Sequence, residues 1–190
     1  MLTEKSRGAA PAILFDNVPG YPQGFRTLYG QLSSARRIAL TLGLPLEYQR
    51  KVDVVQNYHA RMQDLKPLAP RFVNDGPIFE NVVEGDDVDV LKFPVPRHHE
   101  LDTARFIGTA DCVMTQDPDA GWFNLGAYRS QVYDHNTVGC QITEGKHGRI
   151  HRDKYEARNE PMPTAIVLGG DPMSFLMACS ETPYGSSEYD

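Results

Sequence analysis

The chain has 190 residues, of which 41% are hydrophobic and 23% charged. These proportions are those of a globular protein rather than a disordered chain, and the length allows one domain or two small ones. The net charge of −6 argues against a general nucleic-acid-binding protein, which normally presents a basic face.

The N-terminal region and the cysteines indicate a soluble cytoplasmic protein. The first residues are polar, and the apolar run at 12–15 is too short for an export signal or a membrane span. Cys112, Cys140 and Cys179 are widely spaced and form neither a CxxC metal motif nor a disulfide framework. We therefore expect reduced thiols, no membrane span and no nucleic-acid partner.

The first half of the sequence predicts a small α/β unit. Apolar residues recur at helical spacing from Phe25 onward, and Gly43 is a typical stop signal. Pro45 suits the first position of a second helix, which Lys66-Pro67 would end. The expected elements are a strand at 12–15, a turn at 18–24, a helix from 25 to 42 and a helix from 45 to 66.

The composition changes near residue 100, after an acidic, proline-rich stretch at 84–99. We expect an N-terminal α/β region with its linker at 1–100 and a second region at 101–190 that is mostly antiparallel sheet or barrel. The fold class is therefore α+β. The second region's strands are expected at 105–116, 122–128, 129–134, 137–143 and 164–168, with helices at 153–159 and from Pro172 to about Cys179, the latter capped by Asp171.

The run WFNLGAYR, residues 122–129, combines an asparagine, a glycine and an arginine. If a strand runs from Asn124 to Tyr128, alternate side chains share a face, although a bend at Gly126 would blur the alternation. A glycine here would let a ligand approach the backbone closely. The alternative is a β-hairpin with a surface Arg129.

The run EGKHGRIHR, residues 144–152, is the basic cluster of an acidic chain. Fixed cations, an imidazole and a glycine that allows close approach together suit a phosphate group. The alternative is a solvated loop without a ligand, and two histidines four residues apart are a weak metal signal.

The C-terminal run SETPYGSSEYD places Glu188 in a loop fixed by proline and glycine. A solvated acidic residue is the ordinary interpretation of such a position. Asn, His and Glu together would nevertheless make a hard oxygen-and-nitrogen ligand set that suits Mg²⁺ or Mn²⁺. The local spacing does not establish that these residues meet in space.

Four long stretches together resemble the UbiD family of reversible decarboxylases. They are GAAPAILFDNVPGYP, GTADCVMTQDPDAGWFNLGAYRSQVYDHNT, KHGRIHRDKYEARNEPMPTAIVLGGDP and ETPYGSSEYD. The resemblance implies an N-terminal α/β region followed by a flavin-binding domain of split-barrel type. It also implies prenylated FMN as cofactor, a flavin prenyltransferase as the source of that cofactor, and a homo-oligomer in the full-length form.

The resemblance also assigns roles to single residues. It implies a divalent metal, Mn²⁺ or Mg²⁺, held by Asn124, His147 and Glu188, and a K⁺ ion near the backbone of Trp122 and the segment 178–180. The cofactor-binding residues that it implies are Thr109, Asn124, Leu125, Gly126, Ala127, Tyr128, Arg129, Lys146, His147 and Glu188.

Arg129 matches the arginine of the family's acid–Arg–acid catalytic group, which holds the substrate carboxylate. The implied substrates are aromatic, heteroaromatic or α,β-unsaturated carboxylic acids. No acid in the tail after Glu188 matches either acidic partner, so we expect a fragment, incomplete at its C-terminal side, that lacks turnover. The alternatives are a non-catalytic cofactor-binding or assembly subunit of a split decarboxylase, and an ordinary FMN-binding split-barrel protein.

Overall fold

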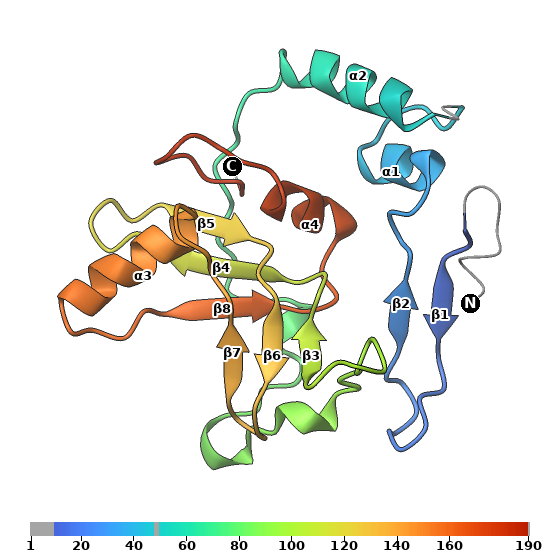
Figure 1. Ribbon diagram of the computed structural model, residues 1–190. Helices are drawn as coiled ribbons and strands as arrows, with labels where there is room; N and C mark the ends of the chain where they lie inside the picture. The colour runs from blue at the N-terminus through green and yellow to red at the C-terminus, as the bar shows by residue number, and fades with distance from the viewer. Residues whose placement is uncertain (1–9, 48–49, 190) are drawn as a thin grey trace. The chain divides into compact units, whose positions relative to one another are not determined.

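The computed structural model describes residues 10–47 and 50–189 (Figure 1). By its internal contacts the chain divides into two compact units, Met1–Pro67 and Leu68–Asp190. This division lies earlier than the boundary near residue 100 that the composition predicts. Residues 68–100 belong to the second unit because their backbone joins it. The N–H of Val90 donates to the carbonyl of His135 at 2.7 Å, and the carbonyl of Pro96 accepts from Phe106 at 3.1 Å.

The first unit begins with an antiparallel hairpin, in which β1 (Ile13–Phe15) pairs with β2 (Thr27–Tyr29). The strand at 12–15 was expected, but the predicted helix from 25 to 42 is wrong over its first half. Residues 27–29 instead find strand partners, and the rings of Phe15 and Tyr29 pack edge to face at 5.6 Å. Gly30, with φ +76°, then breaks any continuous helix.

The two helices of the first unit are shorter than the sequence predicts. α1 (Ala35–Thr41) begins where the Ser34 hydroxyl accepts from the N–H of Arg37, and it ends before Gly43, whose φ is +62°. α2 (Lys51–Met62) begins six residues after Pro45, which lies in an irregular segment. The two helices contact one another and bury Ala39 and Val54.

The second unit contains two three-stranded sheets. One has the order β3 (Arg105–Gly108), β6 (Ser130–Val132), β7 (Val138–Cys140), and the other has the order β5 (Phe123–Gly126), β4 (Cys112–Gln116), β8 (Thr164–Val167). Every pairing is antiparallel, so the expected α+β class is confirmed. Within the described residues neither sheet closes into a barrel.

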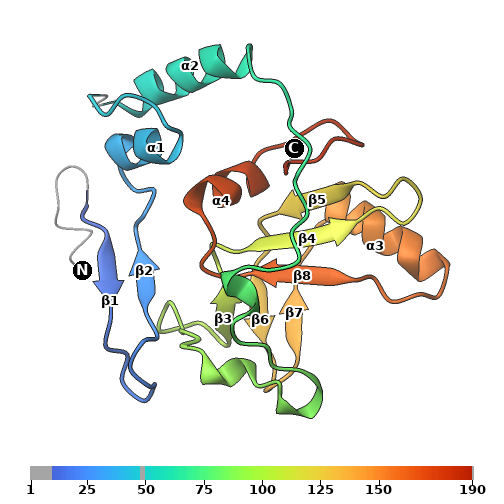
Figure 2. The same cartoon turned by 180° about the vertical axis from the view of Figure 1, so that it is seen from behind.

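Two helices pack against β4 and β5, and Figure 2 shows them from behind. α4 (Pro172–Ala178) is capped as the sequence predicts, because the Asp171 carboxylate accepts from the N–H of Met173 at 2.7 Å. α3 (His147–Ala157) begins six residues before the predicted helix at 153–159 and takes in most of the basic cluster. Residues 147–152 are therefore helical and not the loop of the alternative, while the binding of a ligand by this cluster stays a prediction.

The core of the second unit lies between β4, β5 and α4. It contains the buried residues Cys112, Leu125 and Ala178, against which Met114, Ala127, Val167 and Phe175 pack. Residues 68–100 are mostly irregular, with the short 3₁₀ turns η1 (Pro77–Phe79), η2 (Gly85–Asp87) and η3 (Val90–Lys92). In the part of the chain that the structure describes, no helix combines the length and apolar character needed to cross a bilayer.

Candidate functional site

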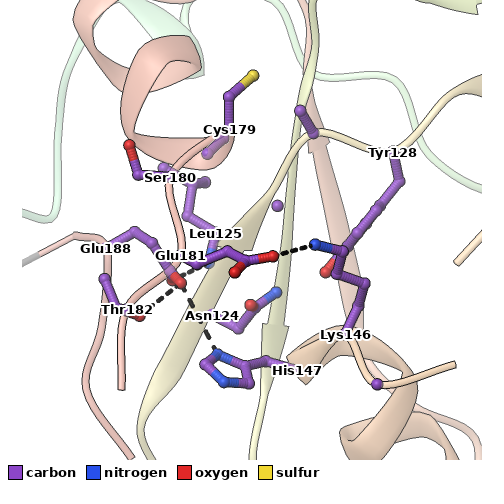
Figure 3. A pocket seen from close by; sticks show the side chains of 14 residues that line it. Asn124, Leu125, Tyr128, Lys146, His147, Cys179, Ser180, Glu181, Thr182 and Glu188 are labelled. Carbon is purple, nitrogen blue, oxygen red and sulfur yellow. Dashed lines mark hydrogen bonds and ion pairs between the residues drawn. The ribbon is translucent and has the colours of Figure 1, made fainter. Parts of the chain in front are cut away.

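A cavity of about 430 Å³ opens between the end of β5, the start of α3 and the segment that follows α4 (Figure 3). We call it the Glu188 cavity. Most of the residues that the resemblance assigns to cofactor and metal line it, although they come from three separate parts of the sequence. The lining residues are Asn124, Leu125, Gly126, Ala127, Tyr128, Gly145, Lys146, His147, Ala178, Cys179, Ser180, Glu181, Thr182 and Glu188.

The Glu188 carboxylate is fixed at both oxygens. Oε2 accepts a hydrogen bond from the N–H of Leu125 at 2.9 Å, and Oε1 accepts one from the hydroxyl of Thr182 at 2.7 Å. The Glu188 side chain is only 4% exposed, so the interpretation of a solvated acidic residue is wrong. Two donors hold its orientation, and lone pairs remain on both oxygens for a further ligand.

Asn124 and His147 lie beside this carboxylate. Nδ1 of His147 is 3.8 Å from Oε1 of Glu188, and Asn124 is 2% exposed on β5. In the described part of the chain, no three His, Cys, Asp or Glu side chains gather into a metal cluster. A set of three side-chain ligands at this position would have to include another kind of donor, and the Asn124 amide oxygen is one that the cavity lining offers.

Tyr128 forms one wall of the cavity by folding back over two glycines. A Cβ atom on Gly126 would lie 2.3 Å from the Tyr128 ring, and one on Gly148 would lie 2.9 Å from it. The Tyr128 side chain, from the loop after β5, thus makes a close approach to the Gly126 backbone, and the approach of a ligand there stays a prediction. Burial raises the pKa of Tyr128, although hydrogen bonds with the Asn124 side chain and the Gly148 backbone act in the opposite direction.

Lys146 stands at the N-terminus of α3, where it pairs with Glu181 at 2.8 Å. That hydrogen bond raises the pKa of Lys146 and lowers the pKa of Glu181. Both side chains are well exposed, at 47% and 84%, so the pair contributes little to stability. It does place a cation beside the positive end of the α3 dipole, and anions bind well at such a position.

A buried network that the sequence patterns did not indicate adjoins the cavity through Asn124. His151 is fully buried, its Nδ1 lies 2.9 Å from the hydroxyl of Thr115, and its ring packs 4.5 Å from that of Trp122. Oδ2 of Asp117 lies 3.7 Å from Nε2 of His151 and 2.6 Å from Nζ of Lys154. The four-residue spacing of His147 and His151 was the available signal, but it marks one face of a helix rather than a metal pair.

The charges of this network are set by its surroundings. Burial alone would raise the pKa of Asp117, but hydrogen bonds from Lys154 and from the backbone N–H groups of Asp119 and Ala120 hold that pKa far below its usual range. Burial lowers the pKa of His151, against the opposing effect of Asp117. At neutral pH the network therefore contains an ionised carboxylate and a neutral imidazole.

Arg129 lies apart from this group. It lines a second cavity of about 300 Å³ with Phe106, Gln131, Tyr133, Gly139, Cys140 and Gln141, and we call this the Arg129 cavity. Its guanidinium lies over the Phe106 ring, 5.1 Å from the centroid. In the described part of the chain, no acidic residue lines this cavity. Burial raises the pKa of the Cys140 thiol, which keeps it protonated.

The other residues that the resemblance assigns to cofactor or K⁺ include Thr109, Trp122 and Ala178. Thr109 is exposed in the turn after β3 and lines neither cavity. The carbonyl of Trp122 accepts from the N–H of Asp117 at 2.9 Å, and that of Ala178 accepts from Ala127 at 3.0 Å. Each of these carbonyls is thus engaged in a backbone hydrogen bond, and the K⁺ site stays a prediction.

The family of this chain follows from its similarity to known proteins. Residues 71–190 match the model of the UbiD family, described as the 3-octaprenyl-4-hydroxybenzoate carboxy-lyase Rift-related domain. This match covers most of the second unit, including both cavities. The chain therefore belongs to the UbiD family.

Individual relatives agree with this assignment. The chain is 35% identical over 188 residues to a pyrrole-2-carboxylic acid decarboxylase of Pseudomonas aeruginosa, covering 94% of this chain and 37% of that protein. It is similar to the closed form of the vanillic acid decarboxylase of Sedimentibacter hydroxybenzoicus, with a TM-score of 0.85 at 31% identity over 96% of this chain and 39% of that one.

A third solved structure is the UbiD-class enzyme HmfF from Pelotomaculum thermopropionicum, in an evolved dimeric form in complex with prFMN. Its TM-score is 0.81 at 26% identity, over 95% of this chain and 40% of that one. The chain thus spans about two fifths of the length of these relatives.

Proposed function

We propose that this chain supplies the metal- and flavin-binding part of a UbiD-type decarboxylase, which acts on aromatic, heteroaromatic or α,β-unsaturated carboxylic acids. The observation that carries the proposal is the buried Glu188 carboxylate, which two donors fix at the wall of the Glu188 cavity. Decarboxylases among the similar proteins support the reaction class.

The donor set fits a hard divalent cation. A buried carboxylate is costly unless a positive charge or hydrogen bonds compensate it. Glu188 has two hydrogen bonds, but among the described residues the basic side chain beside it is the His147 imidazole at 3.8 Å, so a divalent cation would add positive charge. Two kinds of oxygen donor and one imidazole nitrogen are ligands that Mn²⁺ and Mg²⁺ accept. Asn124, His147 and Glu188 would hold that cation, with K⁺ bound near the carbonyls of Trp122 and Ala178.

The rim of the same cavity suits the phosphate of a flavin nucleotide. Lys146 provides a positive charge, and the positive end of the α3 dipole lies at the same rim. Prenylated FMN, when bound, supplies the electron sink for loss of CO₂. The HmfF complex with prFMN supports the choice of cofactor.

Arg129 is the residue to which we assign the substrate carboxylate. A guanidinium binds a carboxylate through two parallel hydrogen bonds, and the Arg129 cavity offers room for a small acid beside the Phe106 ring. In the full-length enzyme, Arg129→Ala is expected to abolish CO₂ release, and turnover equal to the unchanged enzyme would contradict this role.

A second function is a cofactor-holding subunit that does not turn over by itself. In that case the acids that accompany the Arg129 guanidinium would come from another polypeptide, since the described residues lining the Arg129 cavity include none. A companion polypeptide that restores CO₂ release would support this second function.

Native mass spectrometry tests the proposal directly. The chain is co-expressed with a flavin prenyltransferase and supplied with Mn²⁺ and K⁺, and its mass is compared with the 21.3 kDa of the bare chain. We expect a mass increment for prenylated FMN plus metal that Glu188→Ala removes. Glu181→Ala, which changes an exposed acid of the same cavity, should keep it.

A bare mass under all conditions would contradict the binding of cofactor by this chain. Equally tight binding of unmodified FMN without metal would instead favour an ordinary FMN-binding protein of split-barrel type.

A further inference from the structure

The orientation of the Asn124 amide decides whether the Glu188 cavity has a complete set of metal donors. An amide offers a carbonyl oxygen at one end and an NH₂ group at the other, and only the oxygen binds a divalent cation. Which end faces the cavity depends on the hydrogen bonds made by the other end. The residues that make those bonds lie outside the metal set.

Two hydroxyl groups bond this amide: that of Tyr128 at the cavity wall and, on the inner side, that of Thr115. Nδ2 of Asn124 donates to Oγ1 of Thr115 at 3.4 Å, across the paired strands β4 and β5. The same Oγ1 lies 2.9 Å from Nδ1 of His151, on the second turn of α3. The side chains of Asn124, Thr115 and His151 are buried, at 2%, 1% and 0% exposure, so water does not compete for these bonds.

The Thr115 hydroxyl has one proton, and the tautomer of His151 determines where that proton goes. If Nδ1 of His151 is unprotonated, it accepts the hydroxyl proton, and Thr115 presents only lone pairs to Asn124. The amide must then present its NH₂ group to Thr115 and its oxygen to the cavity. If Nδ1 carries a proton, the hydroxyl proton is free to donate to the amide oxygen, and the amide can reverse.

Asp117 selects between these tautomers from the other side of the ring. Its Oδ2 lies 3.7 Å from Nε2 of His151, too far for a hydrogen bond but close enough for a strong electrostatic preference in a buried site. Lys154 and backbone N–H groups keep this carboxylate ionised. The negative charge favours the proton on Nε2 and leaves Nδ1 as the acceptor.

We propose that Asp117, His151 and Thr115 act as positioning residues that turn the oxygen of Asn124 toward the Glu188 cavity. The relay runs from Asp117 through the imidazole and the hydroxyl to the amide. This inference rests on the proposed metal-binding function of Asn124. It adds the three residues that orient the Asn124 amide. Partners of this outer kind change metal affinity by about 10–100-fold when they are removed.

The first test uses the metal-free chain, so that it does not depend on metal binding. Long-range ¹H–¹⁵N correlation spectra report which ring nitrogen of His151 carries the proton. We expect a neutral ring with its proton on Nε2 and a hydrogen-bonded, unprotonated Nδ1. In Thr115→Val, which keeps the shape of the side chain but lacks the hydroxyl, the Nδ1 resonance should shift. A proton on Nδ1 in the unchanged chain would overturn the proposal.

The second test measures Mn²⁺ affinity from the electron paramagnetic resonance signal of the free ion during a titration. Thr115→Val should weaken binding about 10–100-fold, whereas Thr115→Ser, which keeps the hydroxyl, should remain close to the unchanged chain. Equal affinity in all three proteins would overturn the relay. If the unchanged chain binds no Mn²⁺, the proposed function fails separately, and the His151 tautomer still decides the orientation of the amide.

Discussion

Asp117 is a buried carboxylate whose charge is held by neighbours of two kinds, a lysine and two backbone N–H groups. Its pKa in the folded chain lies far below the value of about 3.9 in an unfolded chain. Because the folded pKa is the lower one, its contribution to stability is complete above about pH 4 and is lost as the pH falls toward the folded pKa.

Replacing Asp117 therefore has an effect that depends on pH. We expect Asp117→Asn to lower the free energy of unfolding at pH 7 by about 2 kcal/mol, because hydrogen bonds to a charged group are lost. Its stability should also fall less than that of the unchanged chain between pH 4 and pH 2. Urea unfolding followed by circular dichroism at several pH values measures both effects.

Asp119→Asn is the matched control, because Asp119 binds the same Lys154 at 3.0 Å but is 53% exposed. Solvent screens an exposed pair, so this change should cost much less. Equal losses for the two variants would show that the burial of Asp117 does not explain its contribution.

At the scale of the elements, the Tyr128 ring packs against a glycine of β5, Gly126, and a glycine of α3, Gly148. A Cβ at position 126 would meet the Tyr128 ring at 2.3 Å, so the ring would have to shift and give up its hydrogen bonds with Asn124 and the Gly148 backbone. We expect Gly126→Ala to lower the free energy of unfolding by about 1–3 kcal/mol, as overpacking does. Chemical denaturation measures this change.

Two further variants separate the cause. Gly76→Ala introduces the same atom where no other atom lies within 4 Å, so its cost should be close to zero. In a Tyr128→Ala background, Gly126→Ala should cost much less than in the unchanged chain, because the obstructing ring is gone. An unchanged cost in that background would place the obstruction elsewhere.

The elements that sequence patterns predict correctly are those with local signals. The strand at Thr164–Val167 and the capped start of α4 at Pro172 each follow from a few adjacent residues. The helix predicted from Phe25 fails because Thr27–Tyr29 pairs with a strand 14 residues earlier in the register of Leu14 and Leu28. No helical periodicity reveals such a partner.

α3 was predicted too short for a different reason. Its stabilising pattern lies in charges rather than apolar residues: Arg149 pairs with Asp153 at 2.8 Å and Arg152 with Glu156 at 3.1 Å, each four residues apart. The buried side of its first turns carries a glycine and a histidine, which contribute no apolar periodicity. Hydrophobic spacing therefore places the start of this helix at residue 153, six residues after its observed start at His147.

The site itself was accessible from the sequence only through resemblance. Glu188 and the backbone of Leu125 are 63 residues apart, and no local spacing indicates that they meet. Family motifs brought Asn124, His147 and Glu188 into one set, and the structure places all three at one cavity. Their roles as ligands stay predictions. The Asp117–His151–Thr115 network lies behind the lining residues, where neither motif nor spacing indicated it.

At the scale of the whole molecule, the division of the chain into two units places the candidate site in one of them. Both cavities lie within the second unit, so residues 68–190 contain every residue that lines them. The composition boundary near residue 100 would remove Val95, which is 5% exposed, and the hydrogen bonds from 90 to 135 and from 106 to 96. A fragment that begins at residue 68 keeps these contacts and one that begins at residue 101 loses them, so their stabilities can be compared.

We expect a fragment of residues 68–190 to keep the ¹H–¹⁵N spectrum of the site, with resonances of Asn124 and Thr115 at their positions in the full chain. A fragment of residues 101–190 lacks the buried Val95 and the backbone bonds to His135 and Phe106, so its midpoint in urea should be lower. Equal midpoints for the two fragments would favour the boundary near residue 100. Loss of the site's resonances in the longer fragment would instead mean that residues 1–67 are needed to hold the cavity in its observed form.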